Sequence, residues 1–160
     1  TFRSQGNVVR EELVPTGQSF ALPDLEREGY VLAAWVTGTR TYAPGEILAP
    51  VEDMELTALW RKKVKLTIGY TYYDRYNYQY RDFEIYPLDD DLDFTDYDPQ
   101  TGATVTFTYQ MNLNNNDMYV KIDGVKVDYT KTFQATRVDG KLTYRYTFTI
   151  PGTAFPGDTF

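Results

Sequence analysis

Alternation of apolar and polar residues constrains the fold of this chain more than any other feature of its sequence. In residues 64–72, Val64, Leu66 and Ile68 fall on one side of an extended chain, and intervening residues such as Lys65 fall on the other. The same period of two recurs in residues 103–111, 118–122, 125–129 and 142–150. Because side chains in a β-strand point alternately to opposite faces, the pattern predicts a series of strands that each bury one face.

Two Asp-Gly pairs stand between these alternating runs. Asp123-Gly124 and Asp139-Gly140 are typical of tight hairpin turns, since glycine accepts the positive φ that such turns require. About six or seven strands, each with one apolar face, can bury those faces only if two antiparallel sheets stack. We therefore predict an antiparallel, immunoglobulin-like β-sandwich over residues 64–160. The chain has no cysteine, so we expect its core to depend on packing alone.

Composition argues against most enzyme classes. The 160 residues include no His and no Cys, which excludes histidine acid–base catalysis, thiol nucleophiles and Cys/His zinc sites. The serines of the chain, Ser4 and Ser19, therefore have no histidine to activate them. Paired carboxylates, as in glycoside hydrolysis, are the enzymatic route that composition leaves open. Two small β-modules offer little chain for a cleft, so we expect no enzymatic activity.

The charge balance excludes some partners. The net charge is −7 and the isoelectric point is about 4.6, so the chain repels nucleic acid and anionic lipid surfaces. No stretch approaches the roughly 18 apolar residues of a membrane span. The first residue is Thr rather than Met. We therefore expect a segment of a larger chain, monomeric within it, that binds no nucleic acid and does not insert into a membrane.

The first sixty residues differ in character from the rest. Residues 1–60 carry single apolar residues between Gly and Pro, and a short basic stretch, residues 61–63, separates them from the alternating region. We place a domain boundary at this stretch, between modules 1–60 and 64–160. Tyr30, Trp35 and Trp60 are the largest apolar side chains of the first module. Because so small a unit buries little surface, we expect these three rings in its core.

An ordered set of turns and aromatic residues in this first module resembles a known family. A Gly29-Tyr30 turn leads to Trp35, residues 42–45 form a Tyr-Ala-Pro-Gly turn, and residues 56–59 run into Trp60. In order and spacing the set is similar to the Listeria–Bacteroides repeat, or internalin-type B repeat. The family implies a β-grasp-like module of bacterial surface proteins that acts as a spacer or interaction unit. Ala34 departs from it, because the family usually has Gly before the first Trp.

An acidic run is the first candidate site. Aspartates crowd the region from residue 89 to residue 98: Asp89, Asp90, Asp91, Asp93, Asp96 and Asp98. Calcium prefers several carboxylate oxygens in a loop, so Asp91, Asp93, Asp96 and Asp98 are candidate calcium ligands. The spacing is not that of an EF-hand, since Gly102 comes one position late. The alternative is a solvated acidic connection between strands, and no other cofactor is expected.

A tyrosine cluster is the second candidate site. Tyr70 and Tyr72 continue the apolar face of the strand at 64–72, so we expect both in the core. The remaining members, with a neighbouring cation, are candidate ligand-binding residues: Tyr73, Tyr76, Tyr78, Tyr80 and Arg81. Exposed aromatic rings can stack on sugar rings while polar neighbours bond the hydroxyls. The alternative is that tyrosine is simply a good strand former.

Taken together, these features predict a mainly β chain: a small β-grasp-like module followed by an immunoglobulin-like sandwich. The favoured function is that of a non-catalytic spacer or adhesion unit of a bacterial cell-surface or secreted protein, contacting a protein or glycan ligand. The alternative is a carbohydrate-binding module of a secreted glycan-active enzyme. Either function implies an extracellular location, at the bacterial cell surface or cell wall.

Overall fold

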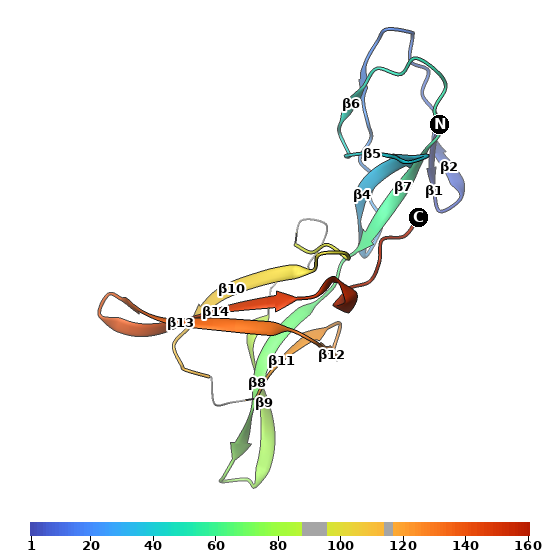
Figure 1. Cartoon of the computed structure of the whole chain (residues 1–160). Coiled ribbons are helices and arrows are strands. Elements are labelled where there is room, and N and C mark those ends of the chain that lie inside the picture. The colour runs from blue at the N-terminus through green and yellow to red at the C-terminus, as the bar shows by residue number, and fades with distance from the viewer. Residues whose placement is uncertain (88–95, 114–116) are drawn as a thin grey trace. The chain divides into compact units, whose positions relative to one another are not determined.

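The computed structural model describes residues 1–87, 96–113 and 117–160. These residues form β-strands and a short 3-10 helix, η1 (Gly152–Ala154), and they contain no α-helix, which confirms the mainly β prediction. The chain divides into two compact units (Figure 1). Unit 1 comprises Thr1–Lys63 and Pro156–Phe160, and unit 2 comprises Val64–Phe155.

Unit 1 is built on a mixed sheet. Its strands are β1 (Phe2–Ser4), β2 (Asn7–Arg10), β3 (Phe20–Ala21), β4 (Tyr30–Thr37), β5 (Arg40–Tyr42), β6 (Ile47–Leu48) and β7 (Leu56–Lys62). Five of them form a sheet in the order β2-β1-β7-β4-β5, while β3 and β6 form a separate pair. The β1–β7 pairing is parallel and the other pairings in the sheet are antiparallel.

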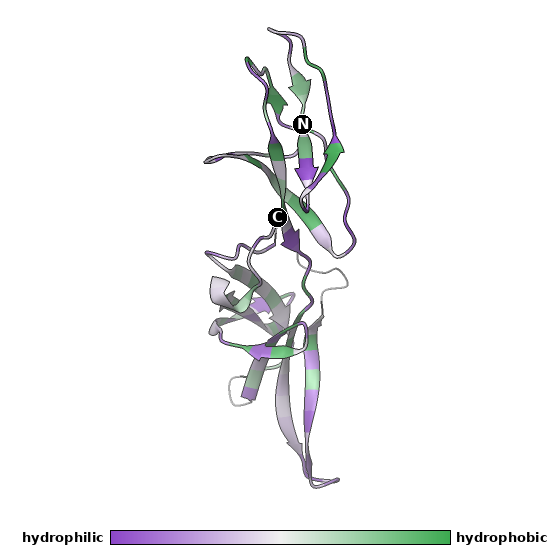
Figure 2. Cartoon of the chain, turned by 90° about the vertical axis from the view of Figure 1, so that its right-hand side faces the viewer, coloured by the Kyte–Doolittle hydropathy of each residue, from purple (hydrophilic) through white to green (hydrophobic). Residues whose placement is uncertain are grey.

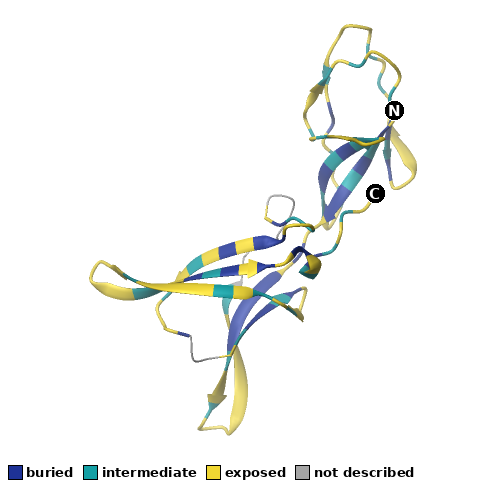
Figure 3. Cartoon of the chain, viewed as in Figure 1, coloured by how far each residue is buried: buried dark blue, intermediate teal, exposed yellow. Residues whose placement is uncertain are grey.

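Both tryptophans lie in the core of unit 1, as predicted. The indole N–H of Trp35 donates to the carbonyl of Pro23 at 2.7 Å, and that of Trp60 donates to Ser4 Oγ at 3.0 Å. Each buried N–H therefore has a partner, which avoids the cost of an unsatisfied polar group. Tyr30 is half-buried and packs against this core from its margin. Within unit 1, Figure 3 shows the buried residues concentrated on β4 and β7.

The last five residues belong to unit 1, which corrects the prediction that 64–160 forms one module. The backbone N–H of Trp60 donates to the Thr159 carbonyl at 2.6 Å, and the reverse bond measures 2.9 Å. Arg61 donates from Nε and Nη2 to the two carboxylate oxygens of Asp158, at 2.9 Å each. The physical reason is that β1 pairs with only the first part of β7, so Trp60 has backbone groups free to bond the tail.

Unit 2 consists of two antiparallel sheets. Its strands are β8 (Leu66–Asp74), β9 (Gln79–Pro87), β10 (Ala103–Tyr109), β11 (Asp117–Ile122), β12 (Val125–Val127), β13 (Thr130–Val138) and β14 (Lys141–Ile150). Within the described residues they pair in the orders β12-β11-β8-β9 and β10-β14-β13. Both Asp-Gly turns are confirmed, with φ of 49° and 81° at Asp123 and Gly124, and 50° and 77° at Asp139 and Gly140.

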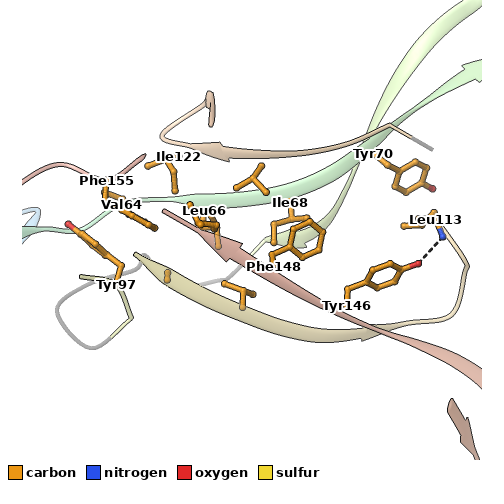
Figure 4. Packing of buried hydrophobic residues seen from close by; sticks show 14 residues of the cluster. Val64, Leu66, Ile68, Tyr70, Tyr97, Leu113, Ile122, Tyr146, Phe148 and Phe155 are labelled. Carbon is orange, nitrogen blue, oxygen red and sulfur yellow. Dashed lines mark hydrogen bonds between the residues drawn. The ribbon is translucent and has the colours of Figure 1, made fainter. Parts of the chain in front are cut away.

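The core of unit 2 gathers side chains from both sheets, which makes the unit sandwich-like (Figure 4). Ile68 of β8 and Phe148 of β14 are fully buried there. Tyr146 ties an adjoining loop to this core: its hydroxyl donates to the Met111 carbonyl at 2.9 Å and accepts from the Leu113 N–H at 2.8 Å. Hydrophobic and hydrophilic residues are interspersed along the strands (Figure 2).

Candidate functional site

The tyrosine cluster lies on the β8–β9 hairpin, which extends beyond the core of unit 2 (Figure 3). After a register shift between Ile68 and Gly69, β8 and β9 pair without a break as far as Asp74 and Gln79, next to the turn. On its other side the described part of β11, which begins at Asp117, pairs with β8 as far as Thr71. Past that residue side chains on both faces of the hairpin are exposed, Tyr73 and Tyr80 on one and Tyr72 on the other.

Asp74 organises the turn of the hairpin. Its Oδ1 accepts from the backbone N–H groups of Tyr76, at 2.9 Å, and Asn77, at 3.3 Å. Its Oδ2 accepts from the Asn77 side-chain amide at 2.8 Å and pairs with Nε of Arg81 at 2.9 Å. An aspartate that bonds backbone groups two and three residues ahead stabilises a turn locally. The next tyrosine, Tyr78, has a φ of 54° and completes the turn.

These bonds change the ionisation of Asp74. The side-chain hydrogen bond from Asn77, followed by the backbone bonds from Tyr76 and Asn77, holds the pKa of the carboxyl below its ordinary value. The positive charge of Arg81 acts in the same direction, while desolvation opposes it. Asp74 is therefore an anion at neutral pH, and its negative form is the one that fits this turn.

The tyrosine rings at the tip are exposed. Tyr76, Tyr78 and Tyr80 are 95%, 82% and 75% exposed, and Tyr73 is exposed to a lesser degree. Tyr73 and Tyr80 are directly opposite each other across the ribbon, and their ring centroids lie 5.1 Å apart at an interplanar angle of 61°. The hairpin thus carries an edge-to-face ring pair on one face and two further rings in its turn.

The opposite face of the ribbon carries a second set of aromatic residues. Tyr72 is 37% exposed, so the prediction that it lies in the core is wrong, whereas Tyr70 is buried as predicted. Phe83 pairs with Tyr70 at 5.5 Å and is also exposed, although the sequence did not single it out. Arg81 is opposite Tyr72 on this face and pairs with Asp74. It therefore lies away from the Tyr73–Tyr80 pair and holds the turn.

The acidic run is only partly described. Asp91 and Asp93 lie outside the described residues. Asp98 lies in a turn, where its Oδ1 accepts from the Gln100 N–H at 2.7 Å and the Thr101 N–H at 3.2 Å. Burial, and secondarily the charge of Asp96, raises the pKa of the Tyr86 phenol. Among the residues that the structure describes, no three potential ligands are grouped to hold a metal ion.

Comparison with known proteins identifies no relative of this chain. No family model, no curated protein and no solved structure matches the chain. In the described part of the chain no helix has the length and hydropathy needed to cross a bilayer.

Proposed function

We propose that this chain is a non-catalytic module of a bacterial cell-surface or secreted protein, a spacer or adhesion unit that contacts its ligand through the β8–β9 hairpin. The observation that carries the proposal is the exposure of Tyr76, Tyr78 and Tyr80 together at the end of a ribbon. Exposure of large aromatic side chains to water is unfavourable, and exposed clusters of them mark interaction sites. Tyrosine supplies contact area with few rotatable bonds, which suits recognition.

Preorganisation of the turn supports this role. The four contacts of Asp74 fix the backbone from Tyr76 to Asn77 before any ligand arrives. A turn that is already ordered loses less conformational entropy on binding. Tyr76 and Tyr78 are thereby presented at fixed positions, and the Tyr73–Tyr80 pair provides a second ring surface beside them.

We assign the two units to module types by analogy. Unit 1 fits a repeat of the Listeria–Bacteroides type, a comparison supported by the buried Trp35 and Trp60 and by the parallel β1–β7 pairing. Unit 2 fits an immunoglobulin-like sandwich, supported by two antiparallel sheets that share one core. Modules of both kinds occur in exported bacterial proteins, which is why we place the parent chain outside the cell.

The second candidate is a carbohydrate-binding module of a secreted glycan-active enzyme. The observation that favours it is the Tyr73–Tyr80 pair, since adjacent rings on one face suit successive sugar units of a chain. Retention of the protein on insoluble cellulose, chitin or xylan would favour this candidate. Binding to host cell-surface glycans or proteins, without retention on those polymers, would favour the adhesion unit.

A glycan array and a pull-down of host surface proteins test the hairpin directly. Tyr76→Ala and Tyr80→Ala should each weaken binding roughly tenfold or more if these rings are hot spots. Phe160→Ala is the matched control, because Phe160 is an exposed aromatic residue, 60% exposed, in unit 1. Binding that survives both tyrosine substitutions, or no binding of the unmodified chain to any glycan or protein, would exclude the hairpin as the contact site.

A further inference from the structure

The outer face of the β10-β14-β13 sheet consists almost entirely of threonine. Its residues, which we call the threonine face, are Thr104, Thr106 and Thr108 from β10, Thr143, Arg145, Thr147 and Thr149 from β14, and Thr130, Thr132, Gln134 and Thr136 from β13. On β10 and β14 they alternate with residues of the core of unit 2, and all of them are exposed or half-buried. This face belongs to the sheet that does not contain the tyrosine hairpin.

Strand register arranges these side chains in rows. Thr147 lies between Thr106 and Thr132, and Thr149 lies between Thr104 and Thr130. Rows repeat about every 7 Å along a strand, and strands lie about 4.8 Å apart. Hydroxyl groups meet across the rows, as for the Thr106 and Thr147 Oγ1 atoms at 3.3 Å. The result is a regular field of hydroxyl donors and acceptors.

Arg145 is the charged member of this face. In register it lies between Thr108 and Gln134, and no carboxylate occupies any position of the threonine face. A surface hollow of about 380 Å³ surrounds it, lined by Thr132, Phe133, Gln134, Arg145 and Thr147. In a chain of net charge −7, an exposed guanidinium without a neighbouring carboxylate on its own face favours an anionic ligand.

We propose that the threonine face binds a carboxylate-bearing polysaccharide, with Arg145 pairing with the carboxylate of an acidic sugar. A guanidinium matches a carboxylate through two parallel hydrogen bonds, which gives both strength and orientation. The Gln134 amide and the hydroxyls of Thr132 and Thr147 border the hollow and bond sugar hydroxyls. The hydroxyl rows favour a glycan over an acidic peptide, because they offer many neutral donors and acceptors around one charge. This site is separate from the hairpin and does not depend on it.

Titration of polygalacturonate into the full chain tests the site. Arg145→Gln should weaken binding roughly tenfold, the loss expected for a charge-assisted bidentate contact. Arg137→Gln is the matched control: it makes the same charge change in the same hairpin, but Arg137 pairs with Leu142 on the opposite face. Neutral dextran should not bind. Equal losses in the two variants, or no binding of polygalacturonate, would overturn the proposal.

Two further arms separate the alternatives. Polyglutamate carries the same carboxylates without sugar hydroxyls, so binding as tight as that of polygalacturonate would show that charge alone is recognised and would overturn the glycan assignment. Tyr80→Ala should leave polygalacturonate affinity unchanged, because Tyr80 lies on β9 of the other sheet. A loss with Tyr80→Ala equal to that with Arg145→Gln would place binding at the hairpin and contradict a separate site.

Discussion

The ring of Tyr119 covers Gly69 across the β11–β8 pair. The two residues are directly opposite each other, and Tyr119 is only 6% exposed although it lies on the outer face of its sheet. A Cβ atom at position 69 would lie 2.5 Å from the Tyr119 hydroxyl oxygen and 2.6 Å from the Phe83 carbonyl oxygen. The ammonium group of Lys121 lies over the Tyr119 ring, with Nζ 4.9 Å from the ring centroid. Glycine is therefore required here by space.

Gly69→Ala should destabilise unit 2 by about 1–3 kcal/mol, because the added methyl group forces the ring or the β9 backbone to move. Urea unfolding followed by circular dichroism would measure the change. Thr71→Ala, on the same face of the same strand, is the control and should cost about 1 kcal/mol or less. In a Tyr119→Ala background the Gly69→Ala penalty should fall but not vanish, since the Phe83 carbonyl remains. An unfolding midpoint for Gly69→Ala equal to that of the unmodified chain would contradict this steric account.

Ser4→Ala should destabilise unit 1 by about 1–3 kcal/mol, because it leaves the buried Trp60 N–H without its acceptor. Both tryptophans of the chain lie in unit 1, so tryptophan fluorescence during denaturant unfolding reports on that unit. Ser19 is exposed, and Ser19→Ala is the matched control with little expected effect. If the two alanine variants unfolded at the same denaturant concentration, the Ser4–Trp60 bond would contribute nothing measurable.

Asp158→Asn should loosen the tail from unit 1 and lower its stability by about 1–3 kcal/mol, because a bidentate charge-assisted contact is lost. The side chains of Arg61 and Asp158 are only 9% and 18% exposed, so water screens the pair little. Hydrogen exchange at the Trp60 amide, which bonds Thr159, should accelerate in the variant. Glu55→Gln, which breaks an exposed pair with Arg3, should change stability by about 1 kcal/mol or less. Unchanged exchange at Trp60 would show that the ion pair does not hold the tail.

Order in the hairpin turn should depend on the ionisation of Asp74. Its pKa in the folded chain is lowered, so the stabilising contribution is complete above the ordinary value of 3.8 and is lost as the pH falls through the lower folded value. Amide chemical shifts of Tyr76 and Asn77 should therefore titrate below pH 3.8. Asp74→Asn should show the acid form of these shifts at neutral pH.

The causes of that shift can be ranked by substitution. Asn77→Ala should raise the pKa of Asp74 more than Arg81→Gln does, since the Asn77 side-chain bond is the largest cause and the Arg81 charge is the smallest of the lowering ones. Asp128→Asn, an exposed aspartate elsewhere in unit 2, is the control and should leave the Tyr76 and Asn77 amides unchanged. Titration of those amides at or above the ordinary value would contradict the role given to Asp74.

Local patterns in the sequence predicted those elements whose side chains alternate strictly. β10 and β14 were expected from apolar residues at every second position, and the Asp-Gly turns were expected from glycine's tolerance of positive φ. β9 and β13 were not predicted, because apolar residues do not recur at every second position along either segment. Their strand conformation is completed by hairpin pairing with β8 and β14, the strands next to them in the sequence, across the turns at residues 75–78 and 139–140.

In the candidate site, too, local sequence patterns predicted some features and missed others. The sequence identified Tyr73, Tyr76, Tyr78 and Tyr80 as exposed, but it placed Tyr72 in the core because the apolar face of β8 continues to that residue. Exposure of Tyr72 is decided by where the packed core of unit 2 ends, at Tyr70 on this strand, and no local pattern contains that information. Likewise, the opposition of Tyr73 to Tyr80 follows from the hairpin register.

By itself the sequence determined that this chain is rich in β-strands, that its tryptophans are buried and that it has no histidine or cysteine for catalysis or metal binding. Only the tertiary structure decided that the tail returns to Trp60, that the hairpin extends beyond the core of unit 2, and that threonines of β10, β14 and β13 form one face. The physical reason is the distance along the sequence between the residues that interact. Burial of alternate side chains follows from neighbours two residues apart, whereas register and sheet edges depend on contacts between segments far apart in the chain.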